Sequence, residues 1–256
     1  MTVEEIKAKY PFLYETHMHT KEASACARCS GDEMARAYKE AGYAGVIVTD
    51  HNWGGNTCVD RSLPWEEWLD LFFTGYDNAK KTGDEIGLQV FRGYEAGYGG
   101  PEFLIYGLEK EDMKKHPEIK TASPEEQYKL VKELGGMVIQ AHPYREEWYI
   151  DKVRLFPDCV DGAETINATH SSSKSTSHNK PVFDERAIVY AKEHGFPQTA
   201  GSDQHSTFLF GGGVAFPTKL ESIQDYIKRI INKEDYVLTN GEAWYDNQGN
   251  VIARNF

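Results

Sequence analysis

Short apolar runs alternate with amphipathic stretches along most of the chain. Residues 45–50 and 137–141 are nearly continuous apolar runs, which are typical of strands buried on both faces of a parallel sheet. Residues 30–41 show the helical counterpart: apolar side chains recur at helical spacing after a capping-box pattern at Ser30 and Glu33, and Gly42 follows. The same patterns predict further strands at residues 10–16, 88–95, 103–108, 161–167 and 198–200, helices at residues 64–82, 123–134, 182–194 and 223–232, and short strand-like pieces at residues 236–239 and 250–252.

This alternation, with polar residues at the strand ends, predicts an α/β fold. Six or seven strand–helix units indicate a barrel of the (β/α) kind or a near relative. Residues 168–180 interrupt the pattern, because they are rich in hydroxyl groups and lack hydrophobic periodicity. They are either a flexible linker or, as we prefer, a substrate-facing loop that carries His170 and His178.

Histidines and carboxylates gather where predicted strands end. His17 and His19 follow the first strand, and side chains at positions i and i+2 of a strand point to the same side. Strand ends converge on one face of a β/α barrel, so the candidate ligands are expected to lie together. They are His17, His19, His51, Glu95, His142, Asp203 and His205. Such donors suit zinc, manganese or iron, and a shared carboxylate can hold two ions, which predicts metal-dependent hydrolysis.

Composition narrows the possible partners. The chain has 256 residues, with 40 acidic and 28 basic side chains and a net charge of −12. We expect one domain over residues 1–256, because the candidate ligands run from the first strand to position 205. The acidic balance argues against an extended nucleic-acid surface but permits a small phosphorylated substrate. No apolar run of about 18 residues and no leader is present, so we expect a soluble, cytoplasmic protein that does not contact membranes; the oligomeric state is not indicated.

The four cysteines do not resemble a secreted disulfide framework. Cys26 and Cys29 form a Cys-x-x-Cys pair, which is either two ordinary loop thiols or a site of metal binding or redox chemistry. Cys58 and Cys159 stand alone, which argues against a four-cysteine zinc site.

Six ordered motifs resemble the polymerase and histidinol phosphatase (PHP) family of metal-dependent phosphoesterases. The motifs are His17-Met18-His19, Thr49-Asp50-His51, Glu95, and residues 141–145, 164–167 and 201–205. The resemblance covers about residues 12–218 and leaves about 219–256 as a C-terminal extension. It implies a distorted barrel of seven β/α units with two or three divalent ions. One ion would be bound by His17, His19, Glu95 and Asp203; Glu95 would bridge to a second ion at His142, and His51 with His205 would contribute to a third.

The chain departs from the family pattern at two positions. Members with three ions carry another histidine a few residues after the first pair, and here Cys26 stands in that neighbourhood. Either Cys26 is a soft ligand, or the third site is weak or completed by a residue from elsewhere. Glu102 stands where the family often has a histidine; it either completes the second ion's ligand set or is an exposed charge.

The remaining candidates concern catalysis and substrate binding. Asp50 is expected to orient His51 or a neighbouring ligand, since metal-bound histidines commonly donate their other nitrogen to an oxygen acceptor. Arg145 either grips a phosphate with its two-pronged guanidinium or forms a surface salt bridge, and Arg28 and His178 are weaker candidates. His205 would protonate the leaving alcohol if it is not occupied by metal.

Together these features predict a hydrolase of small phosphate esters that uses a metal-activated hydroxide. Hydrolysis of amide or other carbon–nitrogen bonds is an alternative on the same barrel, because fold alone does not choose the reaction. A non-catalytic metal-binding regulatory module is the other alternative. The substrate is not indicated; Trp53, beside His51, either stacks on a substrate ring or packs in the core.

Overall fold

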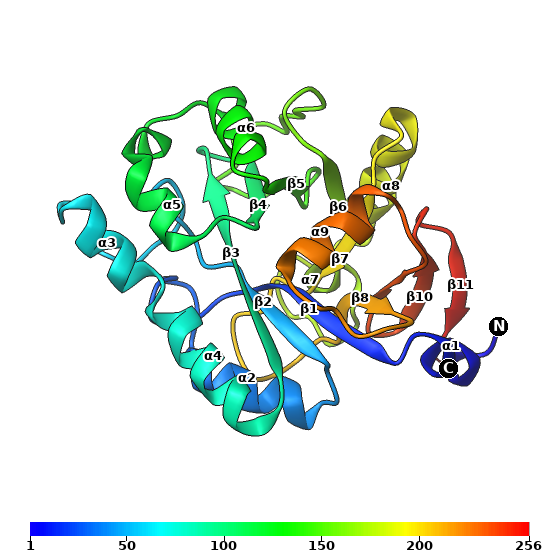
Figure 1. Ribbon diagram of the computed structural model, residues 1–256. Coiled ribbons are helices and arrows are strands. Elements are labelled where there is room, and N and C mark those ends of the chain that lie inside the picture. Colours follow the sequence, from blue (N-terminus) through cyan, green and yellow to red (C-terminus); the bar gives the residue numbers. More distant parts are fainter. Residues whose placement is uncertain (256) are drawn as a thin grey trace.

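The computed structural model, which describes residues 1–255, is built on an eleven-stranded sheet (Figure 1). The strand order is β11-β10-β9-β8-β1-β2-β3-β4-β5-β6-β7. The strands are β1 (Phe12–Met18), β2 (Gly45–Val48), β3 (Gln89–Gly97), β4 (Glu102–Tyr106), β5 (Met137–Ala141), β6 (Gly162–Asn167), β7 (Gln198–Gly201), β8 (Gly212–Phe216), β9 (Val237–Asn240), β10 (Ala243–Asp246) and β11 (Val251–Arg254).

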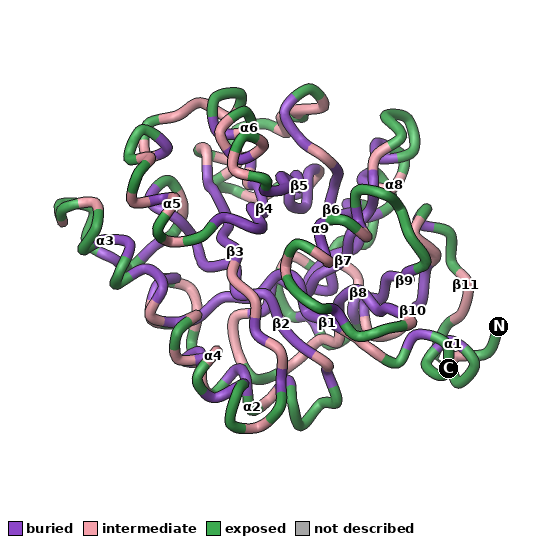
Figure 2. The backbone as a smooth tube through the Cα atoms, in the orientation of Figure 1, coloured by how far each residue is buried: buried purple, intermediate pink, exposed green. Residues whose placement is uncertain are grey.

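Helices cover the outside of this sheet. Figure 2 shows buried backbone along the strands and exposed backbone on the outer sides of the helices. The helices are α1 (Val3–Lys9), α2 (Gly31–Glu40), α3 (Trp65–Phe72), α4 (Thr74–Ile86), α5 (Lys110–Lys115), the 3-10 helix η1 (Pro117–Lys120), α6 (Pro124–Glu133), α7 (Ala168–Ser171), α8 (Val182–His194) and α9 (Ile223–Ile231). None of the helices within residues 1–255 has the apolar length that crossing a membrane requires.

Strands β1 to β7 curl into the predicted distorted barrel. Neighbouring strands are parallel except at β4, which runs antiparallel to both β3 and β5. The end of β1 meets the segment after β7 at a bridge between Met18 and Gln204. There the His19 amide donates to the Gln204 carbonyl at 2.8 Å, and the Gln204 amide donates to the His17 carbonyl at 3.1 Å. This contact brings the first and last motifs of the chain together.

Several local predictions are confirmed. The Ser30 amide donates to Glu33 Oε2 at 2.8 Å at the start of α2, as the capping box predicted. Ser123 and Glu126 form the equivalent reciprocal pair at the start of α6, with Pro124 in the first turn.

The structure corrects other elements. The predicted helix at residues 64–82 is two helices that meet at Phe73. The second helix packs Gly75 so closely against Thr20 that no side chain would fit there, and a side chain at Gly31 would meet the Gly75 carbonyl. The β3–β4 and β5–β6 connections contain no helix, so two of the predicted β/α units are incomplete within residues 1–255.

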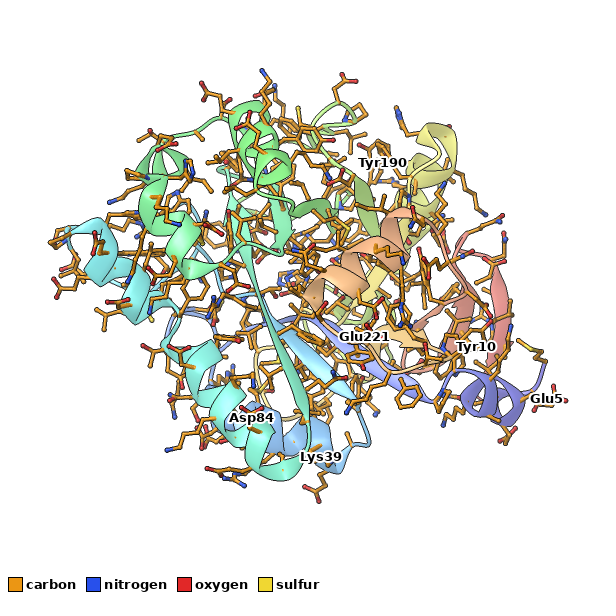
Figure 3. The ribbon with its side chains drawn as sticks, in the orientation of Figure 1. Glu5, Tyr10, Lys39, Asp84, Tyr190 and Glu221 are labelled. Carbon is orange, nitrogen blue, oxygen red and sulfur yellow. The ribbon has the colours of Figure 1, made fainter. Side chains whose placement is uncertain are left out.

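The C-terminal extension continues the same sheet. Each strand from β8 to β11 runs antiparallel to its neighbour, and β8 also pairs antiparallel with β1. Helix α1, which the apolar pattern did not reveal, packs against this part through Ile6 and Trp244. Tyr10, labelled in Figure 3, ends this helix and donates its hydroxyl to Asp235 Oδ1 at 2.5 Å.

A buried carboxylate in β1 joins the two ends of the curl. Glu15 is fully buried, and its Oε1 accepts from the amides of Thr16 and His17, both at 3.0 Å, and of Ser202 at 2.8 Å. Its Oε2 accepts from the Tyr38 hydroxyl at 2.9 Å. Burial raises the pKa of Glu15 to about 7, although these hydrogen bonds oppose the increase. The junction is therefore held together mainly by the hydrogen bonds that the Glu15 oxygens accept, and less by a full negative charge on Glu15.

We predict that Glu15→Ala lowers the free energy of unfolding by at least about 3 kcal/mol, because three buried amides lose their acceptor. Glu15→Gln keeps an acceptor oxygen, and its amide can donate to Tyr38, so it should cost less than about half as much. Urea denaturation of both variants measures the difference. Equal losses in the two variants would show that the charge, and not the acceptor, stabilises the junction.

Candidate metal centre

The predicted ligands lie together at the ends of β1, β2, β3, β5 and β7. Four groups of three side chains have potential ligand atoms within 4.8 Å of one another. These groups are His17 with Glu95 and His142; His17 with His19 and Asp203; His51 with Glu95 and Glu102; and His19 with His51 and His205. The structure thus places all eight predicted ligands in one cluster, while the ion that each would bind stays a prediction.

Glu95 lies in the middle of the cluster, with one oxygen on each side. Its Oε1 is 3.0 Å from His142 Nε2 and 3.2 Å from His17 Nε2. Its Oε2 is 2.8 Å from His51 Nδ1 and 3.5 Å from His19 Nε2. A carboxylate that faces two sets of imidazoles in this way has the arrangement expected of a ligand shared between two ions.

The cluster contains buried atoms whose hydrogen-bonding capacity is unused. His17 Nε2, His51 Nδ1 and Glu95 Oε2 have no hydrogen-bond partner within residues 1–255, and the 2.8 Å contact between the last two lacks hydrogen-bond geometry. Burying such groups is costly unless something satisfies them. Divalent ions that accept imidazole and carboxylate together, such as zinc, manganese and iron, fit this donor set.

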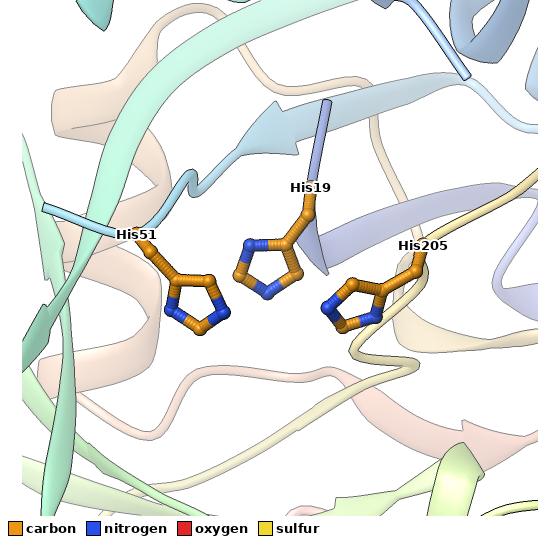
Figure 4. A group of neighbouring side chains, drawn as sticks. All are labelled: His19, His51 and His205. Atoms are coloured by element: carbon orange, nitrogen blue, oxygen red, sulfur yellow. The ribbon is translucent and has the colours of Figure 1, made fainter. Parts of the chain in front are cut away.

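One side of the cluster consists of histidines. Figure 4 shows the rings of His19, His51 and His205 next to one another. The His19 ring centroid is 4.3 Å from that of His51 and 4.4 Å from that of His205. Burial, together with charge on these two neighbours, lowers the pKa of His19 well below its usual value. His19 is therefore neutral, which is the form that can bind a metal ion.

The other side of the cluster combines histidine with carboxylates. Burial alone would lower the pKa of His17, but Glu164, Glu95 and Asp203 outweigh it and raise the pKa well above its usual value. Burial would raise the pKa of Glu95 and of Asp203, and the neighbouring cations, His17 among them, instead lower both well below the usual range. These carboxylates therefore stay charged and require positive charge close by, from protonated histidines or from metal ions.

Glu102 belongs to the cluster and is not an exposed charge. Its side chain is 16% exposed, and its oxygens lie 3.6 Å from His142 Nε2 and 3.8 Å from His51 Nδ1. Each distance is longer than the one between the same histidine nitrogen and Glu95. Glu102 therefore lies at the edge of the cluster.

Two buried groups outside the cluster orient its histidines. Glu164 Oε1 is 2.9 Å from His17 Nδ1, so His17 presents Nε2 to the cluster. Ser24 Oγ is 3.2 Å from His19 Nδ1, accepts from the His51 amide at 3.0 Å, and donates to Asp50 Oδ1 at 2.7 Å. Asp50 thus contacts His19 through Ser24, and its expected role in orienting a ligand stays a prediction.

Arg145 lies beside Asp203 and is buried, so the surface salt bridge that the sequence left open is excluded. Its Nη2 is 2.6 Å from Asp203 Oδ2, and its Nε donates to His170 Nε2 at 3.0 Å. His170 Nδ1 is 2.8 Å from Asp184 Oδ1. Both nitrogens of His170 are therefore occupied, and this buried residue holds Arg145 in place. Contrary to the expectation that His170 faces the substrate, it does not line the pocket that opens beside the cluster.

A pocket of about 1010 Å³ opens beside the cluster. Its walls include the cluster residues His51, Glu102, Asp203 and His205, as well as Arg145 and the predicted substrate-binding residues Arg28 and His178. Residues 168–180 contribute to the wall as predicted, although they begin with the short helix α7. Trp53 is not part of the wall; it packs against Trp65 and Trp68 at ring-centroid distances of 5.0 and 5.6 Å.

Cys26 also lines the pocket. Burial alone would raise the pKa of its thiol, but the neighbouring imidazoles of His205 and His51 outweigh it and lower the pKa to about 7. Cys26 is thus next to the two histidines of the predicted third site, and a role as a soft ligand stays a prediction. Its neighbour in the motif, Cys29, lies near Thr207.

The backbone is strained at two cluster residues. His142 has φ 26° and Asp203 has φ 54°, a region that side-chain-bearing residues seldom adopt. His142 directly follows β5 and Asp203 lies two residues after the end of β7, and at both positions the turn aims the side chain into the cluster. Strain of this kind persists where the surrounding structure enforces it, and it concentrates at functional sites.

Ser24, Asp184 and the orienting role of Glu164 were not found from the sequence. Glu164 belongs to a motif of the PHP resemblance, but nothing in its spacing indicates a contact with His17. Ser24 and Asp184 lie in no recognisable sequence pattern. Only the folded backbone brings each side chain to its histidine.

Comparison with sequences shows a partial relationship. No family model matches the chain. An uncharacterised protein of Methanocaldococcus jannaschii is 29% identical over 137 residues, which are 54% of this chain and 66% of that protein.

Comparison with solved structures is more informative. A two-domain protein of Bacteroides vulgatus that contains a predicted PHP-like metal-dependent phosphoesterase matches with a TM-score of 0.63 and 13% identity, over 91% of this chain and 66% of that chain. The fold is that of the PHP-like metal-dependent phosphoesterases. A Bifidobacterium adolescentis protein, named as an inferred metal-dependent phosphoesterase, matches this PHP-like fold with a TM-score of 0.51 and 16% identity, over 86% of this chain and 96% of that chain. PsfC of Pseudomonas syringae matches with a TM-score of 0.54 and 14% identity, over 84% and 87%.

We predict that Ser24→Ala weakens metal binding about 10- to 100-fold, the usual effect of removing a group that orients a histidine ligand. The serine is the hydrogen-bond partner of His19 Nδ1, so its loss frees the ring to rotate. Competition with a chromogenic chelator measures the affinity. Ser62→Ala, in an exposed loop, is the matched control and should leave the metal affinity unchanged. An unchanged affinity in Ser24→Ala would show that Ser24 does not support metal binding.

Proposed function

We propose that this protein is a metal-dependent hydrolase of small phosphate esters. The observation that carries the proposal is Glu95, whose two oxygens face His17 and His142 on one side and His51 and His19 on the other. The pocket beside this cluster gives a substrate access to it. The PHP-like fold supports the proposal, and so do the names of two structural neighbours.

The four groups overlap, because His17, His19, His51 and Glu95 each belong to two of them. The cluster would therefore hold fewer ions than groups, namely two or three. His17, His19, Glu95 and Asp203 would bind one ion, Glu95 with His142 and Glu102 a second, and His51 with His205 a third. Zinc, manganese or iron would supply Lewis acidity to a phosphoryl oxygen and lower the pKa of water.

Positive side chains in the pocket favour a phosphate ester over an amide. Arg145 is buried and keeps its charge, and its planar guanidinium can donate two hydrogen bonds to phosphate oxygens. The contact with His170 fixes its orientation. Arg28 lines the same pocket and adds positive charge that an uncharged amide substrate would not need, and His178 offers a further hydrogen-bonding group there.

His205 is our candidate for the proton donor to the leaving alcohol in the form of the protein in which no third ion occupies it. Its Nδ1 donates to the Asp203 carbonyl at 2.8 Å, which leaves Nε2 to carry the transferable proton. Burial would lower the pKa of His205, but Cys26 and Asp203 beside it raise the pKa above the usual 6.5. The imidazolium form is therefore present near neutral pH, as general acid catalysis requires.

We expect the protein to release phosphate from esters only when metal is bound. Protein stripped with a chelator should be inactive on a panel of aryl and alkyl phosphates and should regain activity with manganese, zinc or iron. Glu95→Gln should lose at least about 100-fold in kcat/KM, because removal of the shared carboxylate disrupts more than one ion site. Glu125→Gln, an exposed carboxylate, is the control. Absence of phosphate release with every metal and ester would overturn the proposal.

We also expect His205→Gln to slow alkyl phosphates by about 100-fold or more and aryl phosphates far less. A general acid contributes about 10²- to 10⁴-fold where the leaving group needs a proton, and phenols leave as anions with little help. Rates across a series of leaving groups measure this dependence. An equal loss for both ester types, accompanied by loss of bound metal, would show that His205 acts as a ligand only.

A further inference from the structure

Large aromatic side chains stand exposed at the pocket beside the metal cluster. Trp148 is 93% exposed, Phe208 is 64% exposed and Tyr149 is 46% exposed, and all three line the pocket. Trp148 and Tyr149 follow β5, whereas Phe208 follows β7. Two separate loops thus present aromatic rings to the same cavity.

Trp148 differs from the other tryptophans of the chain. Trp53, Trp68 and Trp244 are buried, and Trp65 is half-buried and donates its indole N–H to the Met113 carbonyl at 2.8 Å. Exposing a whole indole sacrifices the hydrophobic stabilisation that burial would give. An exposed aromatic group beside a polar cavity is therefore typical of a surface that a ligand covers.

The loop that carries Trp148 is anchored on both of its preceding residues. Glu146 binds Arg186 of α8 at 2.8 Å, and Glu147 binds His178 at 2.6 Å. Both ion pairs link this loop to segments after β6. The Trp148 indole itself packs edge-on against Tyr149, with ring centroids 5.6 Å apart, and otherwise remains exposed to a ligand.

The charge of the pocket complements an anion that carries such a ring. Arg145 and Arg28 line the same cavity as the aromatic side chains, and Arg145 is fixed next to the cluster. The volume of about 1010 Å³ is at the upper end of the range of small-molecule sites, about 300–1,000 Å³, and far exceeds what a small alkyl phosphate fills. The pocket therefore has room for a phosphate ester with a large organic part.

We propose that the substrate is a phosphate ester of about nucleotide size whose organic group carries a flat aromatic ring, which stacks on Trp148 and Phe208 while Arg145 holds the phosphate. This inference rests on the proposed phosphoesterase function. The aromatic residues supply affinity and selectivity for the organic group and take no part in the chemical step.

The test uses two matched phosphonates, in which a methylene group replaces the ester oxygen so that hydrolysis cannot occur. One is the analogue of adenosine 5′-monophosphate, and the other is the analogue of ribose 5-phosphate, which lacks the base. Calorimetric titration of the metal-loaded protein should show at least ten-fold tighter binding of the adenosine compound. Trp148→Ala and Phe208→Ala should each weaken that compound by roughly five- to a hundred-fold, the range for base stacking on an aromatic side chain, and leave the ribose compound unchanged.

Two controls make the result specific. Trp148→Phe should retain most of the preference, because a ring remains, and Leu71→Ala, which is 46% exposed but does not line the pocket, should have no effect. Equal affinity for the two phosphonates, or equal losses for both in Trp148→Ala and Phe208→Ala, would overturn the inference. Because binding needs no turnover, a protein that prefers the adenosine compound yet cleaves no ester would overturn only the phosphoesterase proposal.

Discussion

The structure depends on charge balance around one fully buried carboxylate, Glu95. Four imidazoles lie within 3.5 Å of its oxygens, and Asp203 and Glu164 add negative charge within the same set of contacts. Such a concentration of charge in a protein interior is unfavourable unless opposite charge neutralises it and hydrogen bonds satisfy the remaining atoms. The raised pKa of His17 and the lowered pKa of Glu95 show that protons can supply this balance, and metal ions would supply it by displacing them.

The surrounding fold makes this arrangement rigid. Glu164 orients His17, the Asp50–Ser24 pair orients His19, and Asp184 orients His170, which in turn holds Arg145. The contact between Glu164 and His17, which lie on β6 and β1, depends on the curl of the sheet, whereas the other two join residues in nearby segments of the chain. Glu15 secures that curl by joining β1 to the segment after β7.

The pocket combines two recognition surfaces. The metal cluster and the arginines occupy its polar wall, and exposed aromatic rings occupy the loops after β5 and β7. Both loops follow a residue with positive φ, His142 or Asp203. A sharp turn at each strand end thus directs a candidate ligand inward and carries the following loop outward to the pocket mouth. In this way the same backbone feature positions both the candidate ligands and the loops that line the pocket.

The amino-acid sequence alone determined the strand–helix alternation, the capping box at Ser30, the helix start at Ser123, and the placement of the candidate ligands at strand ends. These features depend on local periodicity and on short spacings, such as that of His17 and His19 within β1. It could not reveal the break at Phe73, the antiparallel β4 or the added strands β8 and β10, because short segments take their conformation from the partners against which they pack. Only the tertiary structure decided that Asp50 acts through Ser24, that His170 supports Arg145, and that Trp148 and Phe208 share one pocket. The physical reason is that contacts between residues far apart in the chain, such as the one between His19 and Asp203, 184 positions apart, exist only after the sheet has curled.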